Sequence, residues 1–151
     1  MSFIYSWFNR RLTISQCYFV NENALCTFIR HWISPELITS FDVSHCYWIS
    51  AEFLLNTISS MSQLNELSIQ DTKLSLSHLS KIFESCDHIV KIGISLVEDN
   101  WNNFEFDLGS NLSTTIETLS NGFGKLISLK ILAFNCTYYI DTWLVILQLL
   151  R

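Results

Sequence analysis

Hydrophobic and polar residues recur along the chain in a nine-residue pattern, L-x-x-L-x-L-x-x-C. The pattern occurs at residues 38–46 (ITSFDVSHC), 64–72 (LNELSIQDT), 89–97 (IVKIGISLV) and 129–137 (LKILAFNCT). A weaker copy at residues 9–17, NRRLTISQC, has Asn9 at the first position. The apolar residues at the fourth and sixth positions alternate with small or polar ones, which predicts a short strand with one buried face.

The ninth positions of the five copies are Cys17, Cys46, Thr72, Val97 and Thr137, which are 29, 26, 25 and 40 residues apart. The first three intervals are close to the lengths of units that stack into solenoids, and the last indicates one unit with an insertion or an additional degenerate unit. A buried thiol or hydroxyl at the ninth position can bind backbone groups where the chain turns away from the strand.

A predicted helix follows each turn. Asn21, Ser50 and Asp141 precede apolar residues with helical spacing, and their side chains suit the N-cap, where they accept from free backbone N–H groups. The predicted helices carry apolar stripes that would pack against the sheet: Phe53, Leu54, Ile58 and Met61 in one, Leu76, Leu79, Phe83 and Cys86 in another.

This combination resembles the cysteine-containing leucine-rich repeats of F-box/leucine-rich-repeat proteins, over residues from about 10 to 150. The resemblance implies an α/β fold, a leucine-rich-repeat solenoid in which short parallel strands form a curved arc and helices cover the convex side. We expect one domain over residues 1–151, with about five repeats and an insertion at about 98–111. The apolar residues that precede Arg151 suggest a fragment of a longer array.

The family supplies substrate receptors of cullin–RING ubiquitin ligases, so the resemblance implies a substrate-recognition module whose partner is a protein. No F-box helix pattern precedes the first repeat, so a ligase adaptor would bind only if an F-box exists elsewhere in the full-length protein. Two alternatives remain open. The chain could be a stand-alone scaffold or regulator without a ligase link, or a secreted recognition domain.

Composition narrows the class of partner and the compartment. The net charge is −5 and the basic residues form no stripe, which argues against nucleic acid as the partner. The apolar run at residues 143–150 is far shorter than the roughly 20 residues that span a membrane, so no membrane partner is expected. Five dispersed cysteines favour reduced thiols and a cytoplasmic or nuclear location.

We expect no enzyme activity, and no catalytic, cofactor-binding or metal-binding residues. The pair Cys86 and His88 has ligand-like spacing, but no second pair accompanies it, and Cys86 falls on an apolar helical stripe. His45 and Cys46 are neighbours in a predicted strand and would point to opposite faces, so they could not readily share a proton.

Residues at the third, fifth and seventh positions should point out of the sheet. They form either a solvated face or a surface for a protein ligand. Aromatic anchors are missing from these columns and occur instead in the insertion, where Trp101 and Phe104 either fill a gap in the core or bind the ligand. The candidate protein-binding residues are therefore Asp42, Ser44, Glu66, Ser68, Gln70, Lys91, Trp101 and Phe104.

Overall fold

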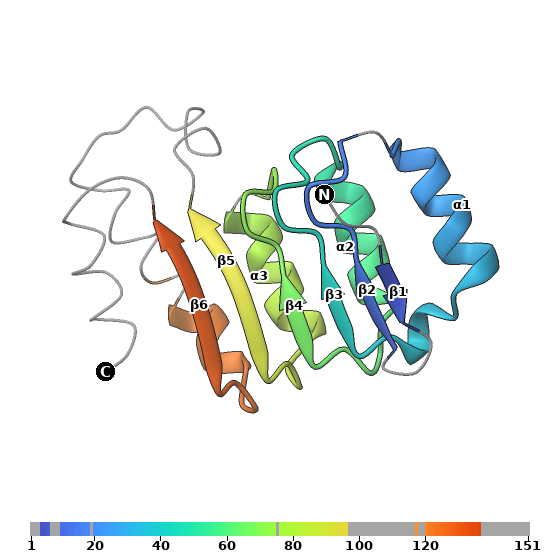
Figure 1. The fold of residues 1–151 in the computed structure, drawn as a ribbon. Coiled ribbons are helices and arrows are strands. Elements are labelled where there is room, and N and C mark those ends of the chain that lie inside the picture. The colour runs from blue at the N-terminus through green and yellow to red at the C-terminus, as the bar shows by residue number, and fades with distance from the viewer. Residues whose placement is uncertain are drawn as a thin grey trace.

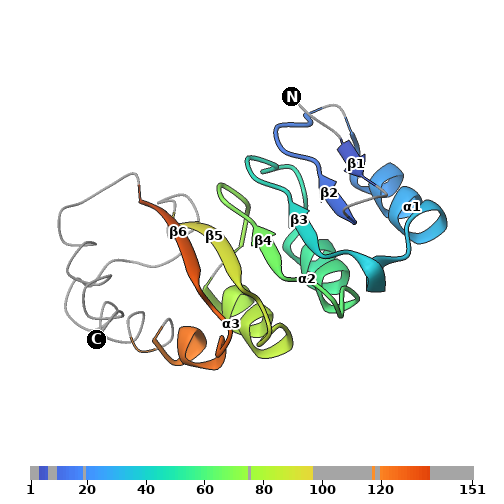
Figure 2. The ribbon, with the colours of Figure 1, turned by 60° about the horizontal axis from the view of Figure 1, so that its bottom comes forward.

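The computed structural model describes residues 4–6, 10–18, 20–74, 76–96, 117 and 120–136. These residues form an α/β structure with two layers, a six-stranded sheet and a set of helices on one of its faces (Figures 1 and 2). The expected insertion at about 98–111, with Trp101 and Phe104, lies outside the described residues, as does Asp141.

The strands lie in the sheet in the same order as in the sequence. Five neighbouring strands are parallel, and the first strand is antiparallel to the second. The strands are β1 (Ile4–Ser6), β2 (Arg11–Thr13), β3 (Ser40–Asp42), β4 (Glu66–Ser68), β5 (Lys91–Leu96) and β6 (Ile131–Cys136).

The register of the parallel strands matches the alignment of the five sequence copies. Residues at the fourth position pair in one row across the sheet: Leu12 with Phe41, Phe41 with Leu67, Leu67 with Ile92, and Ile92 with Leu132. The first four of these side chains are fully buried, whereas Leu132 is half-buried at the far edge. The predicted strands and their buried face are therefore confirmed.

Two of the helices begin where the sequence predicts. α1 (Glu22–Trp32) is capped by Asn21, whose Oδ1 accepts from the Ala24 N–H at 2.7 Å, and α2 (Ala51–Ser59) is capped by Ser50, whose Oγ accepts from the Phe53 N–H at 3.2 Å. The remaining helical elements are η1 (Pro35–Leu37), α3 (Leu76–Ser85) and a segment at residues 120–125.

The core lies between the sheet and the helices. Leu54 and Ile58 of α2, Met61 just after it, and Leu79 and Phe83 of α3 are buried against the apolar strand residues. Burial of this apolar surface is the main favourable contribution to folding. Phe53, the other predicted member of the α2 stripe, is half-buried at the margin of this core.

β1 was not predicted from the sequence. Its residues carry no copy of the nine-residue pattern, yet they pair with β2 in antiparallel register, Ile4 with Thr13 and Ser6 with Arg11. This pairing satisfies backbone groups of β2 that would otherwise form an open edge of the sheet. Among the helices that the structure describes, none is both long and apolar enough to cross a bilayer.

Candidate protein-binding face

The candidate face is the side of the sheet opposite the helices (Figure 2). Residues at the third position, beside the start of each strand, form one row: Arg11, Ser40, Glu66, Lys91 and Ile131. Residues at the fifth position form the next row: Thr13, Asp42, Ser68, Gly93 and Ala133.

An ion pair links the first row across an intervening strand. Nη2 of Arg11 in β2 lies 3.0 Å from Oε1 of Glu66 in β4. Ser40, which lies between them in β3, donates a weaker hydrogen bond to Oε2 of Glu66 at 3.5 Å. Lys91 pairs with Glu66 by register, and its side chain is exposed. Charges of both signs therefore stand side by side on the face.

The predicted binding residues Ser44 and Ser68 bond to each other across neighbouring strands, so their hydroxyl groups stabilise the face. Ser44 is buried, and its Oγ lies 2.6 Å from the Oγ of Ser68 in a hydrogen bond. Oδ1 of Asp42 accepts from the Ser44 N–H at 2.9 Å. Of the candidates, Asp42, Glu66, Ser68 and Gln70 are half-buried.

Gly93 leaves room for its neighbours on this face. A Cβ at this position would lie 3.1 Å from Oγ of Ser68 and 3.6 Å from Cδ of Gln70. The missing side chain allows these two residues to pack over β5, where any larger residue would push them aside.

The turns at the ends of the strands contain strained residues at the eighth position. Gln16, His45 and Asp71 all have positive φ, at 59°, 61° and 53°. Most residues other than glycine disfavour this region, so the surrounding structure must hold these turns in place. Two hydrogen bonds contribute, from the Gln16 N–H to the carbonyl of Ser44 and from the His45 N–H to the carbonyl of Gln70.

A polar chain crosses these turns. Nδ1 of His45 lies 2.7 Å from Oδ2 of Asp71, and Oγ of Ser95 donates to Oδ1 of the same carboxylate at 2.7 Å. The carboxylate therefore lies between the histidine and the serine. In a nucleophilic triad the histidine occupies the middle position and takes the proton from serine, so this order suits a structural link and not activation of Ser95.

Two of the five ninth positions, Cys46 and Thr72, have the role that the sequence predicts, whereas Val97 and Thr137 lie outside the described residues. Cys17, Cys46 and Thr72 are buried; Sγ of Cys46 donates to the carbonyl of Ile14 at 3.1 Å, and Oγ1 of Thr72 donates to the carbonyl of Ile69 at 2.8 Å. Burial raises the pKa of the Cys46 thiol, although the backbone N–H groups of Cys17 and Gln16 oppose this shift.

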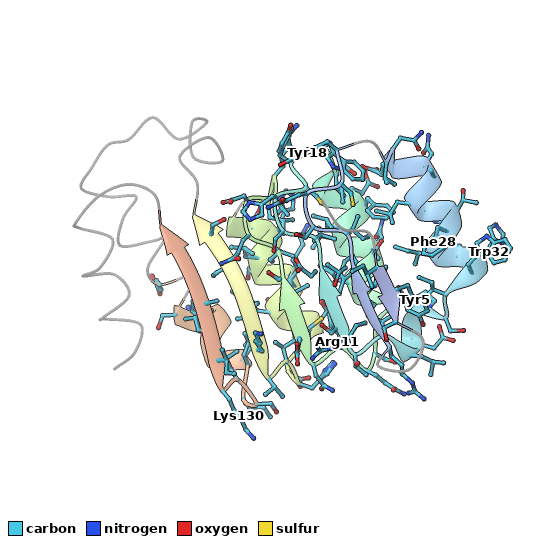
Figure 3. The ribbon with its side chains drawn as sticks, in the orientation of Figure 1. Tyr5, Arg11, Tyr18, Phe28, Trp32 and Lys130 are labelled. Atoms are coloured by element: carbon cyan, nitrogen blue, oxygen red, sulfur yellow. The ribbon has the colours of Figure 1, made fainter. Side chains whose placement is uncertain are left out.

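The structure also reveals an aromatic pair that the sequence reasoning missed. Tyr18 and Tyr47 follow the two ninth-position cysteines, and their ring centroids lie 5.6 Å apart. Tyr18 lies at the end of the sheet where the strands finish (Figure 3). The repeated dipeptide Cys-Tyr at residues 17–18 and 46–47 was a signal that could have found the pair.

The metal-like pair does not assemble into a site within the described residues. Cys86 is buried in the core, and Nδ1 of His88 lies 3.4 Å from Oδ1 of Asp87 in a long, exposed contact. No group of three or more potential metal ligands occurs in the described part of the chain.

Comparison with protein-family models, with curated proteins and with solved structures finds no match to this chain.

Proposed function

We propose that this chain is a protein-interaction module of the leucine-rich-repeat type, which binds a protein partner through the sheet face opposite its helices. The observation that carries this proposal is the register of β2 to β6, which brings the third and fifth positions of five sequence copies into two continuous rows. In the first three copies every residue of these rows is polar or charged. Buried cysteine or threonine at the turns of the first three copies supports the assignment to this class of repeat.

The distribution of charge on the face favours selective binding. Arg11, Glu66 and Lys91 place alternating charges in one row, and Asp42 adds a carboxylate in the next. Charges of both signs in fixed positions attract a partner with the complementary pattern and repel partners with the wrong one. Within this row, the carboxylate of Glu66 contacts both Arg11 and Ser40.

Within this class, we propose the substrate-recognition part of an F-box-type ubiquitin ligase receptor. The alternatives are a stand-alone scaffold or regulator, and a secreted recognition domain. A cytoplasmic or nuclear location fits the free thiols of Cys17, Cys26, Cys46 and Cys86. Thiol titration of denatured protein without reductant tests the location: five free thiols are expected, and fewer would favour the secreted alternative.

Affinity capture with charge-exchanged variants tests the binding face. The double change Glu66→Lys with Lys91→Glu exchanges two neighbouring charges of the sheet face and leaves the net charge unchanged. The control exchanges exposed charges on the helices, Glu52→Lys with Lys81→Glu. We expect the first variant to lose the captured partner and the control to retain it, with both variants folded by circular dichroism. Equal capture by both variants would contradict the proposal.

A further inference from the structure

Three successive units of the fold contain a serine at the same point, just before the turn that leads into the next strand. In each unit, the carbonyl of the residue after this serine accepts a hydrogen bond from the backbone N–H three residues later, which makes the turns equivalent. These bonds run from Ile38 to Pro35, from Leu64 to Met61 and from Ile89 to Cys86, at 3.0, 3.1 and 3.3 Å. The three serines are Ser34, Ser60 and Ser85.

The hydroxyl groups of these serines differ in their bonding. Oγ of Ser60 donates to the carbonyl of Thr57 at 2.6 Å, and Oγ of Ser85 donates to the carbonyl of Lys81 at 2.9 Å, so both are bonded to the preceding helix. The side chain of Ser34 is exposed, does not cap η1, and forms no hydrogen bond with another residue that the structure describes. Of the three hydroxyl groups, that of Ser34 is therefore free to react.

The residue that follows the serine differs as well. Met61 and Cys86 are buried in the core, whereas the residue after Ser34 is the one proline of the chain, the half-buried Pro35. Proline disfavours a helical conformation of the residue before it. Ser34 accordingly has extended backbone angles, φ −82° and ψ 100°, and so has Ile33, with φ −126° and ψ 137°.

The segment around Ser34 lies at the surface. Trp32, two residues earlier, is 68% exposed and points away from the sheet at the end of α1 (Figure 3). The other exposed residues of this segment are Arg30, His31, Glu36 and Leu37. An extended, exposed segment with a free hydroxyl is the form in which protein kinases bind the residue that they phosphorylate.

We propose that Ser34 is a phosphorylation site for a proline-directed serine/threonine kinase, a class that selects its acceptor by the proline that follows it. Oγ of Ser34 attacks the γ-phosphorus of ATP and forms the new O–P bond. The bond from this phosphorus to the oxygen that bridges the β-phosphate breaks, and ADP leaves with the electron pair. The catalytic aspartate of the kinase accepts the hydroxyl proton.

The modification is compatible with the fold and with the proposed binding face. Because the hydroxyl of Ser34 has no bond to the described residues, a phosphate there breaks none, whereas a phosphate on Ser60 or Ser85 would break a bond to a helix carbonyl. The added charge of about −1.5 to −2 falls on the connection between α1 and β3, outside the strands. This inference is independent of the proposed function.

The test incubates the folded full chain with magnesium, ATP and a purified mitogen-activated protein kinase. Added phosphate is measured by intact mass, and its position by fragmentation of the peptides. We expect one phosphate, on Ser34, and none in Ser34→Ala. Pro35→Ala should lower the initial rate about ten-fold or more, because the kinase loses the residue that selects the acceptor. Circular dichroism checks that both variants fold.

Ser60 and Ser85 serve as internal controls, because they occupy equivalent turns without a following proline. Ile33 is buried, so a synthetic peptide of residues 30–38 is compared with the folded chain to show whether the fold leaves Ser34 open. We expect the kinase to phosphorylate both. The proposal is overturned if the folded chain gains no phosphate on Ser34, if Pro35→Ala reacts as fast as the unaltered chain, or if Ser60 or Ser85 reacts as fast as Ser34.

Discussion

His45 and Asp71 occupy equivalent positions on successive turns, and Nδ1 of the histidine lies 2.7 Å from Oδ2 of the aspartate. Both residues have positive φ, so each turn is strained and the contact between them joins two strained segments. The contact links the chain after β3 to the chain after β4, beyond the last residues that pair in the sheet.

A β-branched residue at position 45 should therefore destabilise the fold. At a φ of 61°, the two branches of valine would clash with the backbone, and the link to Asp71 would also be lost. We expect His45→Val to lower the free energy of unfolding by about 1–3 kcal/mol in urea denaturation. His45→Asn is the control, since asparagine tolerates this backbone region, and it should cost less than His45→Val. Equal losses would show that the backbone strain has no role.

Alkaline pH should destabilise the protein partly through Cys46. Burial raises the pKa of this thiol in the folded state, so above the ordinary thiol pKa of about 8.5 the unfolded chain loses a proton that the folded chain retains. The stability contribution is complete below that pH and is lost as the pH rises towards the folded-state pKa. We expect Cys46→Ser to show a smaller loss of unfolding free energy between neutral and alkaline pH.

Cys26→Ser is the control for this measurement, because Cys26 is a partly exposed thiol on α1. The loss of unfolding free energy between neutral and alkaline pH should be smaller for Cys46→Ser than for this control. If both serine variants show the same dependence as the unaltered chain, titration of Cys46 contributes nothing to alkaline destabilisation.

Two glycines in the helical segment at residues 120–125 should respond in opposite ways to alanine. A Cβ on Gly122 would overlap Cδ2 of the buried Phe83, whereas a Cβ on Gly124 would meet no atom within 4 Å. We expect Gly122→Ala to destabilise the fold by about 1–3 kcal/mol through overpacking. Gly124→Ala should stabilise it by about 0.5–1 kcal/mol, because alanine favours the helix.

Thermal unfolding of the two alanine variants tests this pair. Phe83 also packs against Phe123, with ring centroids 5.1 Å apart. The Cβ added in Gly122→Ala should therefore alter the packing of these two rings as well. Similar melting temperatures for the two variants would mean that this helical segment does not pack on α3 as described.

The sequence predicts the strands well because one physical signal repeats. At positions such as Leu12, Phe41 and Leu67, burial of every second side chain fixes the register, since a slip of one residue would expose all of them. The N-caps at Asn21 and Ser50 were equally predictable, because a short polar side chain before an apolar helix has one dominant local role.

Other features depend on contacts that no local pattern encodes. β1 forms because β2 has an open edge with which it can pair. The residue types of Ile4 and Tyr5 do not indicate which strand they pair with. The positive φ angles of the turns could not be predicted, because Gln16, His45 and Asp71 share a backbone conformation but no residue type.

The same limit applies to the candidate site. Asp42, Glu66 and Lys91 could be placed on the face from the strand period alone. That Ser44 is buried against Ser68 requires knowledge of how neighbouring strands pack, and the approach of Tyr18 to Tyr47 requires the geometry of successive turns.

The division of the strands into a buried face and an exposed face, on which the proposed binding site depends, is tested most directly by alanine substitution at two adjacent residues of β5. Ile92 is fully buried and Lys91 is exposed. Urea denaturation should show a loss of about 2–5 kcal/mol for Ile92→Ala and a change within about 0.5 kcal/mol for Lys91→Ala. Equal losses, or a larger loss for Lys91→Ala, would contradict the register and with it the proposed binding face.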